Sequence, residues 1–312
     1  MHAAKRPRTD DSPSLNITRS DIWFDDGNII VQAETTQFRL YKGALCASSA
    51  ILKEAVENLG ESKGVEGCPI LFLSDSSEDL GCLLHVMFYP WSYPADEPIH
   101  FSVLAAFLRL GRKYEIKPLY EKALARFTAV FPSSVDDYLN ADLKNKLVRR
   151  DPDTSRRGEV AVDAIVLGRE LGIVSVLPAA FWCASMYPQY LATPSTRSLT
   201  DDDRDIILRT TTPLQVAYST YLFDWLDEAV VPSPSCTQGP SCTQAKTQLS
   251  LKLWKPNNSM WRLRWLPWCV EGLCRSCAAL GKKHHHEGVE RLWKELPSFF
   301  NLPEWEEILA LC

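Results

Sequence analysis

Residues 18–130 carry short apolar runs followed by helical apolar stripes, and this order constrains the fold more than any other feature. Apolar runs at 22–24 and 29–31 flank an Asp-Gly pair. Such a pair predicts a β-hairpin, because glycine readily adopts the positive φ that a tight turn needs. Further short strands are expected at 38–40 and 70–73.

Helical periodicity follows these strands. Five apolar residues have the spacing i, i+3, i+4, i+7, i+8 of one helix face: Leu80, Leu83, Leu84, Met87 and Phe88. Asp75 and Glu78 precede them in the arrangement of a capping box, which marks a helix start. Beyond a polar loop at 144–158, the pattern predicts helices at about 159–171, 174–186, 203–209 and 213–228.

A short motif recurs along this helical part. Leu110, Gly111, Arg112 and Ile116 have counterparts at a constant offset in Leu167, Gly168, Arg169 and Ile173. The recurrence suggests that one helix-hairpin plan is used twice. The sequence as a whole therefore predicts an α+β domain at 18–130 after a disordered tail at 1–17, an all-helical domain at 131–230, and an irregular, cysteine- and tryptophan-rich region at 231–312.

The composition limits the classes of function. A net charge of -5 does not favour a protein that coats nucleic acid or membrane with its whole surface. No apolar run approaches the roughly 20 residues that span a bilayer, and the N-terminal residues have no apolar signal region. We therefore expect a nuclear or cytoplasmic protein whose cysteines are free thiols or metal ligands.

Several segments, taken in their order along the chain, resemble the BTB/POZ domain. The resemblance rests on 20–24 (Ser-Asp-Ile-Trp-Phe), on 38–45 with Ser48, on 83–89 and on 110–119. Tyr41 stands where the family usually has histidine, and Gly111 where it has alanine. Farther along, Leu296 to Trp305 (Leu-Pro-x-x-Phe-x-Leu-Pro-x-Trp) is similar to the tail of many fungal BTB-containing proteins.

The resemblance implies a BTB/POZ fold, with a short three-stranded sheet and helices, and a role in protein association. Its partners would be a second copy of the chain or another BTB protein. In the family the first strand and first helix make the dimer contact, which points to Ile22, Trp23, Leu45 and Ile51. Alternatively these are ordinary core residues. Some family members are adaptors for cullin-type ubiquitin ligases, but the loop at 92–98 does not match their apolar-x-acidic motif.

The common catalytic and phosphate-binding motifs are missing from the sequence. It contains no G-x-G-x-x-G, G-x-x-x-x-G-K-[ST], G-x-S-x-G or H-E-x-x-H. We expect a protein that is not an enzyme.

The cysteines of the C-terminal region offer the clearest candidate site. Cys274 and Cys277 form a C-x2-C pair, and Cys236 and Cys242 form a wider C-x5-C pair. A C-x2-C turn presents two thiolates to one point, as structural zinc sites require. The two pairs could therefore hold one structural zinc ion. Cys269 or a residue of the histidine run 284–286 could replace one ligand, and the alternative is a set of isolated thiols.

Two further patterns concern localisation and nucleic acid. Residues 246–283 are basic and include Trp254, Trp261, Trp265 and Trp268. Such a segment could bind phosphates and stack on bases as a nucleic-acid-binding regulator, or its tryptophans could form a small core, which makes nucleic acid an unexpected partner. The cluster Lys5, Arg6, Pro7 and Arg8 resembles a nuclear-import signal.

Overall fold

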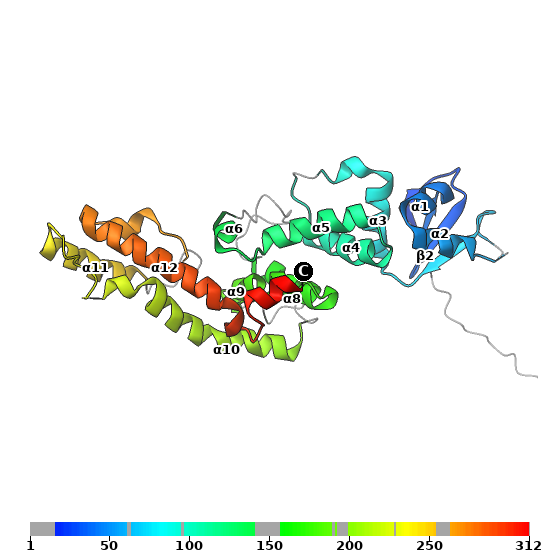
Figure 1. The fold of residues 1–312 in the computed structure, drawn as a ribbon. Helices are drawn as coiled ribbons and strands as arrows, with labels where there is room; N and C mark the ends of the chain where they lie inside the picture. Colours follow the sequence, from blue (N-terminus) through cyan, green and yellow to red (C-terminus); the bar gives the residue numbers. More distant parts are fainter. Residues whose placement is uncertain are drawn as a thin grey trace, which may run out of the picture. The chain divides into compact units, whose positions relative to one another are not determined.

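The computed structural model divides the chain into two compact units, which we call the N-terminal unit (1–123) and the C-terminal unit (124–312) (Figure 1). The residues that the structure describes are 16–60, 64–94, 97–140, 157–188, 191, 199–227, 229–253 and 263–311.

A four-stranded mixed sheet forms the N-terminal unit together with helices. Its strands are β1 (Thr18–Trp23), β2 (Ile29–Ala33), β3 (Thr36–Leu40) and β4 (Ile70–Leu73), in the order β1-β3-β2-β4. Strands β2 and β3 are antiparallel, whereas β1 runs parallel to β3 and β4 parallel to β2. The α+β class is confirmed, and the sheet has four strands where three were expected.

The predicted hairpin at the Asp-Gly pair is wrong, because β1 pairs with β3 and not with β2. The hairpin joins β2 to β3 instead, and Glu34 in its turn has a φ of 49°. Gly27 has a different role: a Cβ there would lie 2.9 Å from the Leu40 carbonyl oxygen. Gly27 thus closes a turn, its amide donating to the Phe24 carbonyl at 2.9 Å, and it also permits a close approach of two backbone segments, but the turn does not pair β1 with β2.

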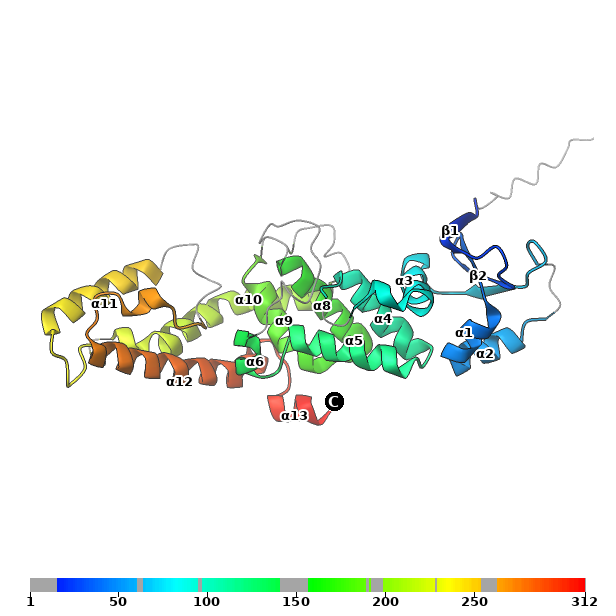
Figure 2. The same cartoon turned by 90° about the horizontal axis from the view of Figure 1, so that it is seen from above.

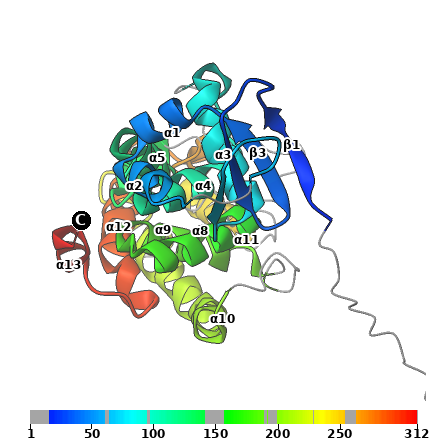
Figure 3. The same cartoon turned by 90° about the vertical axis from the view of Figure 1, so that its right-hand side faces the viewer.

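One core joins the sheet to helices α1 (Lys42–Ser48), α2 (Ala50–Glu57) and α3 (Ser77–Phe88), as Figure 3 shows for α3 beside β3. The predicted helical stripe is buried at Leu80, Leu83 and Leu84. The N-cap of α3 is Ser76, whose hydroxyl accepts a hydrogen bond from the Asp79 amide at 3.1 Å. The cap therefore lies one residue after the expected position at Asp75. The Glu34 carboxylate adds a second cap by accepting from the Ser77 amide at 3.0 Å.

The recurring motif forms the same turn twice. After η1 (Pro90–Ser92), α4 (Phe101–Lys113) turns into α5 (Lys117–Val130), and in the C-terminal unit α8 (Arg157–Leu171) turns through η3 (Val174–Val176) into α9 (Leu177–Ser185). The Ile116 amide donates to Gly111 and the Ile173 amide to Gly168, both at 2.8 Å. Glu115 and Gly172, at matching places, both have positive φ. The shared motif therefore specifies a shared helix end.

Helix α10 (Asp201–Ala217) replaces the two helices expected at 203–209 and 213–228. It continues into a π-helical turn, η6 (Tyr218–Leu222), and then η7 (Asp224–Leu226). Pro213 does not interrupt the helix, because buried residues on both sides of it, including Ile207 and Leu214, hold the helix against its neighbours. Tertiary packing here outweighs the local preference of proline.

The C-terminal region is helical rather than irregular, which corrects the prediction for 231–312. Following α6 (Val135–Asn140) and the elements above, the unit adds α11 (Gly239–Leu253), η9 (Pro267–Val270), α12 (Arg275–Phe299) and α13 (Trp305–Ala310). Figure 2 shows α12 alongside α10. A Cβ at Gly288 would lie 1.9 Å from the Tyr221 carbonyl oxygen, so glycine is needed where α12 crosses η6. Among the described residues, every helix is too short or too polar to cross a membrane.

Candidate metal centre

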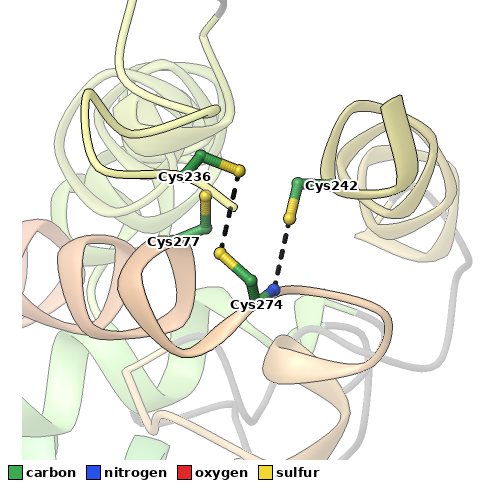
Figure 4. Close-up of side chains that lie close together, drawn as sticks. All are labelled: Cys236, Cys242, Cys274 and Cys277. Carbon is green, nitrogen blue, oxygen red and sulfur yellow. Dashed lines mark hydrogen bonds between the residues drawn. The ribbon is translucent and has the colours of Figure 1, made fainter. Parts of the chain in front are cut away.

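Three segments of the C-terminal unit bring four cysteines together (Figure 4). Cys236 lies in the loop before α11, and Cys242 lies in the first turn of α11. Cys274 is the N-cap of α12, and Cys277 follows in its first turn. The C-x2-C pair thus starts a helix, which fixes the direction of both side chains.

The four sulfur atoms lie within 4.8 Å of one another. The Cys236 and Cys274 sulfurs are 3.7 Å apart. A tetrahedral zinc site with Zn–S bonds of 2.3 Å has sulfurs about 3.8 Å apart. The described cluster is therefore close to the geometry of a four-sulfur metal site, and these cysteines could hold a metal ion.

Backbone amides point at the sulfurs. The Gln238 amide donates to Cys236 at 3.4 Å, the Cys274 amide to Cys242 at 3.2 Å, and the Ser233 amide to Cys277 at 3.3 Å. Amide hydrogen bonds stabilise thiolates, which are the metal-binding form of cysteine. The loop before α11 and the start of α12 therefore form a second layer around the site.

The thiols differ in their pKa values. The amide of Cys277, with that of Thr237, lowers the pKa of the Cys274 thiol to about 6. Burial raises the pKa of the Cys242 thiol to about 12, because a buried thiolate loses its hydration. A cation placed among the four sulfurs would offset that penalty.

The starts of α11 and α12 both face the cluster (Figure 4). A helix N-terminus carries a partial positive charge, which stabilises anions within its first turn. Four thiolates around a divalent ion leave a net charge of about -2. Two helix N-termini beside the cluster reduce the cost of burying this charge.

A small apolar cluster surrounds the sulfurs, and we call it the cysteine module. Its buried members are Trp225, Val231, Cys242, Leu249, Cys274 and Cys277. Trp265 and Trp268 pack against them, and the Trp265 ring lies 5.2 Å from that of Trp225 and 5.4 Å from that of His285. These two half-buried tryptophans are part of a small core, as the alternative to a nucleic-acid surface expects. Trp254 and Trp261 lie outside the described residues.

The alternative ligands lie elsewhere. Cys269 is buried, with its thiol pKa raised by burial, but it does not belong to the four-sulfur group. His284 faces Asp224, with Nδ1 3.1 Å from the carboxylate, and His286 faces Glu290 at 3.4 Å. His285 is buried against aromatic rings. Within the described residues, none of these groups joins the four sulfurs.

The candidate dimer residues fall into two pairs. Ile22 and Leu45 are 2% and 1% exposed and lie inside the core of the N-terminal unit. This burial is what the alternative of ordinary core residues expects for these two. Trp23 and Ile51 are half-buried, and the Arg19 guanidinium lies 4.5 Å from the Trp23 ring. The import cluster, Lys5 to Arg8, lies outside the described residues.

The sequence reasoning missed the serines beside the cysteines. The Ser276 hydroxyl oxygen lies 3.0 Å from that of Ser233 and 2.5 Å from that of Ser235. These contacts fasten the loop of Cys236 to the start of α12. Ser-Pro-Ser directly before Cys236 is the only local signal, and it indicates a turn rather than a particular partner.

Four sulfur ligands leave no open coordination position, so a metal here would stabilise the fold rather than bind substrate. No protein-family model matches the chain, and no curated protein matches its sequence.

Proposed function

We propose that the chain is a protein–protein interaction scaffold that oligomerises through its N-terminal unit, with a C-terminal unit fixed by one structural zinc ion. The observation that carries the interaction part is the position of β1 at the edge of the sheet. An edge strand leaves a row of backbone donors and acceptors unpaired, and a second chain can add to it. Trp23, half-buried at the end of this strand, lies where such a contact would form.

Sedimentation of the full chain at micromolar concentration tests this proposal. We expect a dimer for the unchanged protein and mostly monomer for Trp23→Ala. Trp91→Ala is the matched control, because Trp91 belongs to the same unit, is 72% exposed and lies in η1 rather than in the sheet. A monomer before any substitution, or equal dimerisation of both variants, would contradict the proposal. Cullin binding is a separate prediction that a pull-down tests.

The zinc part rests on the 4.8 Å limit between the four sulfurs. Sulfur-only, tetrahedral sites favour zinc among the abundant divalent ions, and their ligands are deprotonated on binding. Elemental analysis of the full chain should find about one zinc per chain, as for a single four-ligand site. The double variant Cys274→Ser, Cys277→Ser should lose it, whereas Cys269→Ser should keep it.

A further inference from the structure

The four cysteines of the proposed zinc site differ in their access to solvent. Cys242 and Cys277 are 0% exposed and Cys274 is 8% exposed. Cys236 is partly exposed, in the loop that leads into α11. A small oxidant in solution therefore reaches Cys236 first, because a more exposed sulfur is more accessible to oxidation.

The sulfur of a second cysteine lies close to that of Cys236. The Cys274 sulfur lies 3.7 Å from that of Cys236, and Figure 4 marks this contact with a dashed line. A disulfide bond of about 2.05 Å needs the two sulfurs to approach by less than 2 Å. Cys274 is held at the start of a helix, but Cys236 lies in a loop. A shift of less than 2 Å is small enough for the Cys236 side chain and its loop to supply while Ser233 and Ser235 stay attached to Ser276.

We propose that a hydroperoxide joins Cys236 to Cys274 in a disulfide and thereby releases the metal ion. This inference rests on the proposed zinc site. The Cys236 thiolate attacks one oxygen of hydrogen peroxide, the O–O bond breaks, hydroxide leaves, and a sulfenic acid forms. The Cys274 thiolate then attacks this sulfur, the S–O bond breaks, and a second hydroxide leaves. The two sulfurs supply the two electrons that reduce the peroxide.

The consequence for the C-terminal unit follows from where the ligands lie. Only Cys242 and Cys277 remain as thiolates, and two ligands do not complete a tetrahedral site. The new disulfide keeps the loop attached to α12, while Cys242 loses its bond to the rest of the site. Oxidation should therefore loosen α11 selectively.

The test uses the full chain loaded with zinc and treated with hydrogen peroxide. A coloured chelator follows zinc release, and mass spectrometry of peptides without reduction identifies the disulfide. We expect release together with a disulfide between Cys236 and Cys274, reversed by a thiol reductant and added zinc.

Two variants sharpen the result. Cys236→His keeps a ligand in a Cys3His set, which zinc accepts, but removes the exposed thiol, so release should be at least about tenfold slower. Cys269→Ser removes a buried cysteine outside the four-sulfur group and should release zinc at the rate of the unchanged protein.

The possible outcomes distinguish the absence of the proposed zinc site from the absence of the proposed oxidation. A purified chain without zinc overturns the proposed site and this inference with it. Zinc that stays bound under peroxide, or a disulfide between Cys274 and Cys277 instead, overturns this inference alone. If Cys236→His does not hold zinc, disulfide mapping on the unchanged protein still decides.

Discussion

The N-terminal unit and the cysteine module are stabilised in different ways. The first has a core of leucine, isoleucine, valine and phenylalanine around one sheet. In the second, three of the six buried members are cysteines. Each buried leucine or valine contributes about 1.5–3 kcal/mol, but a cysteine side chain is smaller and contributes less unless it binds a metal. We therefore expect the apolar core of the N-terminal unit to be stable by itself, and the stability of the cysteine module to depend on what its sulfurs bind.

Removal of the metal should produce the largest difference in stability between the two regions. A chelator should greatly accelerate amide hydrogen exchange in α11 and in the first turns of α12, and leave β2 and β3 unchanged. In small zinc domains the metal contributes about 10 kcal/mol or more to folding. Hydrogen-exchange mass spectrometry measures both regions in one sample. Unchanged protection of α11 in zinc-free protein would show that the module folds without metal.

Leu83→Ala should have the opposite effect, because it should destabilise the N-terminal unit and leave the cysteine module unchanged. Leu83 is 0% exposed in the core of the N-terminal unit, and a leucine-to-alanine change in such a place costs about 2–5 kcal/mol. The zinc content should not change. Phe72→Ala is the control, because Phe72 is 68% exposed and its loss should be nearly neutral. Urea unfolding and elemental analysis test both expectations.

A single methyl group should distinguish two glycines. Gly288→Ala would place a Cβ 1.9 Å from the Tyr221 carbonyl oxygen and should destabilise the C-terminal unit by about 3 kcal/mol. Gly43→Ala, in α1 of the N-terminal unit, meets nothing within 4 Å and should be neutral or stabilise by up to about 1 kcal/mol. Equal thermal shifts for the two variants would mean that the close helix crossing is wrong.

The smallest expected effect concerns pH and the N-terminal unit. The amide and then the hydroxyl of Ser77 lower the pKa of Glu34 by hydrogen bonding to its carboxylate. A lowered folded-state pKa contributes stability above the unfolded pKa, and this contribution is lost as the pH falls through the folded value. Glu34→Gln should therefore reduce stability slightly at pH 6 and progressively less below pH 4. Chemical unfolding at several pH values measures this, and a pH-independent difference would contradict it.

The apolar periodicity predicted much of the fold correctly, whereas the Asp-Gly signal led to a wrong prediction of the hairpin. Leu80, Leu83 and Leu84 follow a helical repeat because one face of α3 meets the core, and a repeat of this kind is visible in the sequence. The turn between β2 and β3 uses Glu34 at positive φ, a residue type that gives no turn signal. Gly27 gives the signal but serves a contact with a strand that is distant in sequence.

The sequence predicted that the four cysteines of the candidate metal centre come together, but it left Cys269 and the histidine run as alternative ligands. The turn of Cys274 and Cys277 is local, so their spacing indicates the geometry. The exclusion of Cys269 depends on η9, which packs that side chain away from the four sulfurs, and no spacing rule contains this information. The role of Ser233 as donor to Cys277 likewise depends on a contact between residues 44 positions apart.

Helix α12 links two ends of the C-terminal unit mechanically. Its 25 residues span about 37 Å at 1.5 Å per residue. It begins directly after Cys274, and near its other end Trp293 stacks on Trp305 and donates to the Ser133 carbonyl at 2.6 Å. Residues 300–304 separate α13 from α12, but Trp305 also stacks on Trp293 and donates to its carbonyl, so a load applied at α13 reaches α12 and passes along this helix to Cys274 and Cys277. The resistance of this helix to being pulled out of the unit is therefore shared between the sulfur cluster at its start and its crossing with η6 at Gly288.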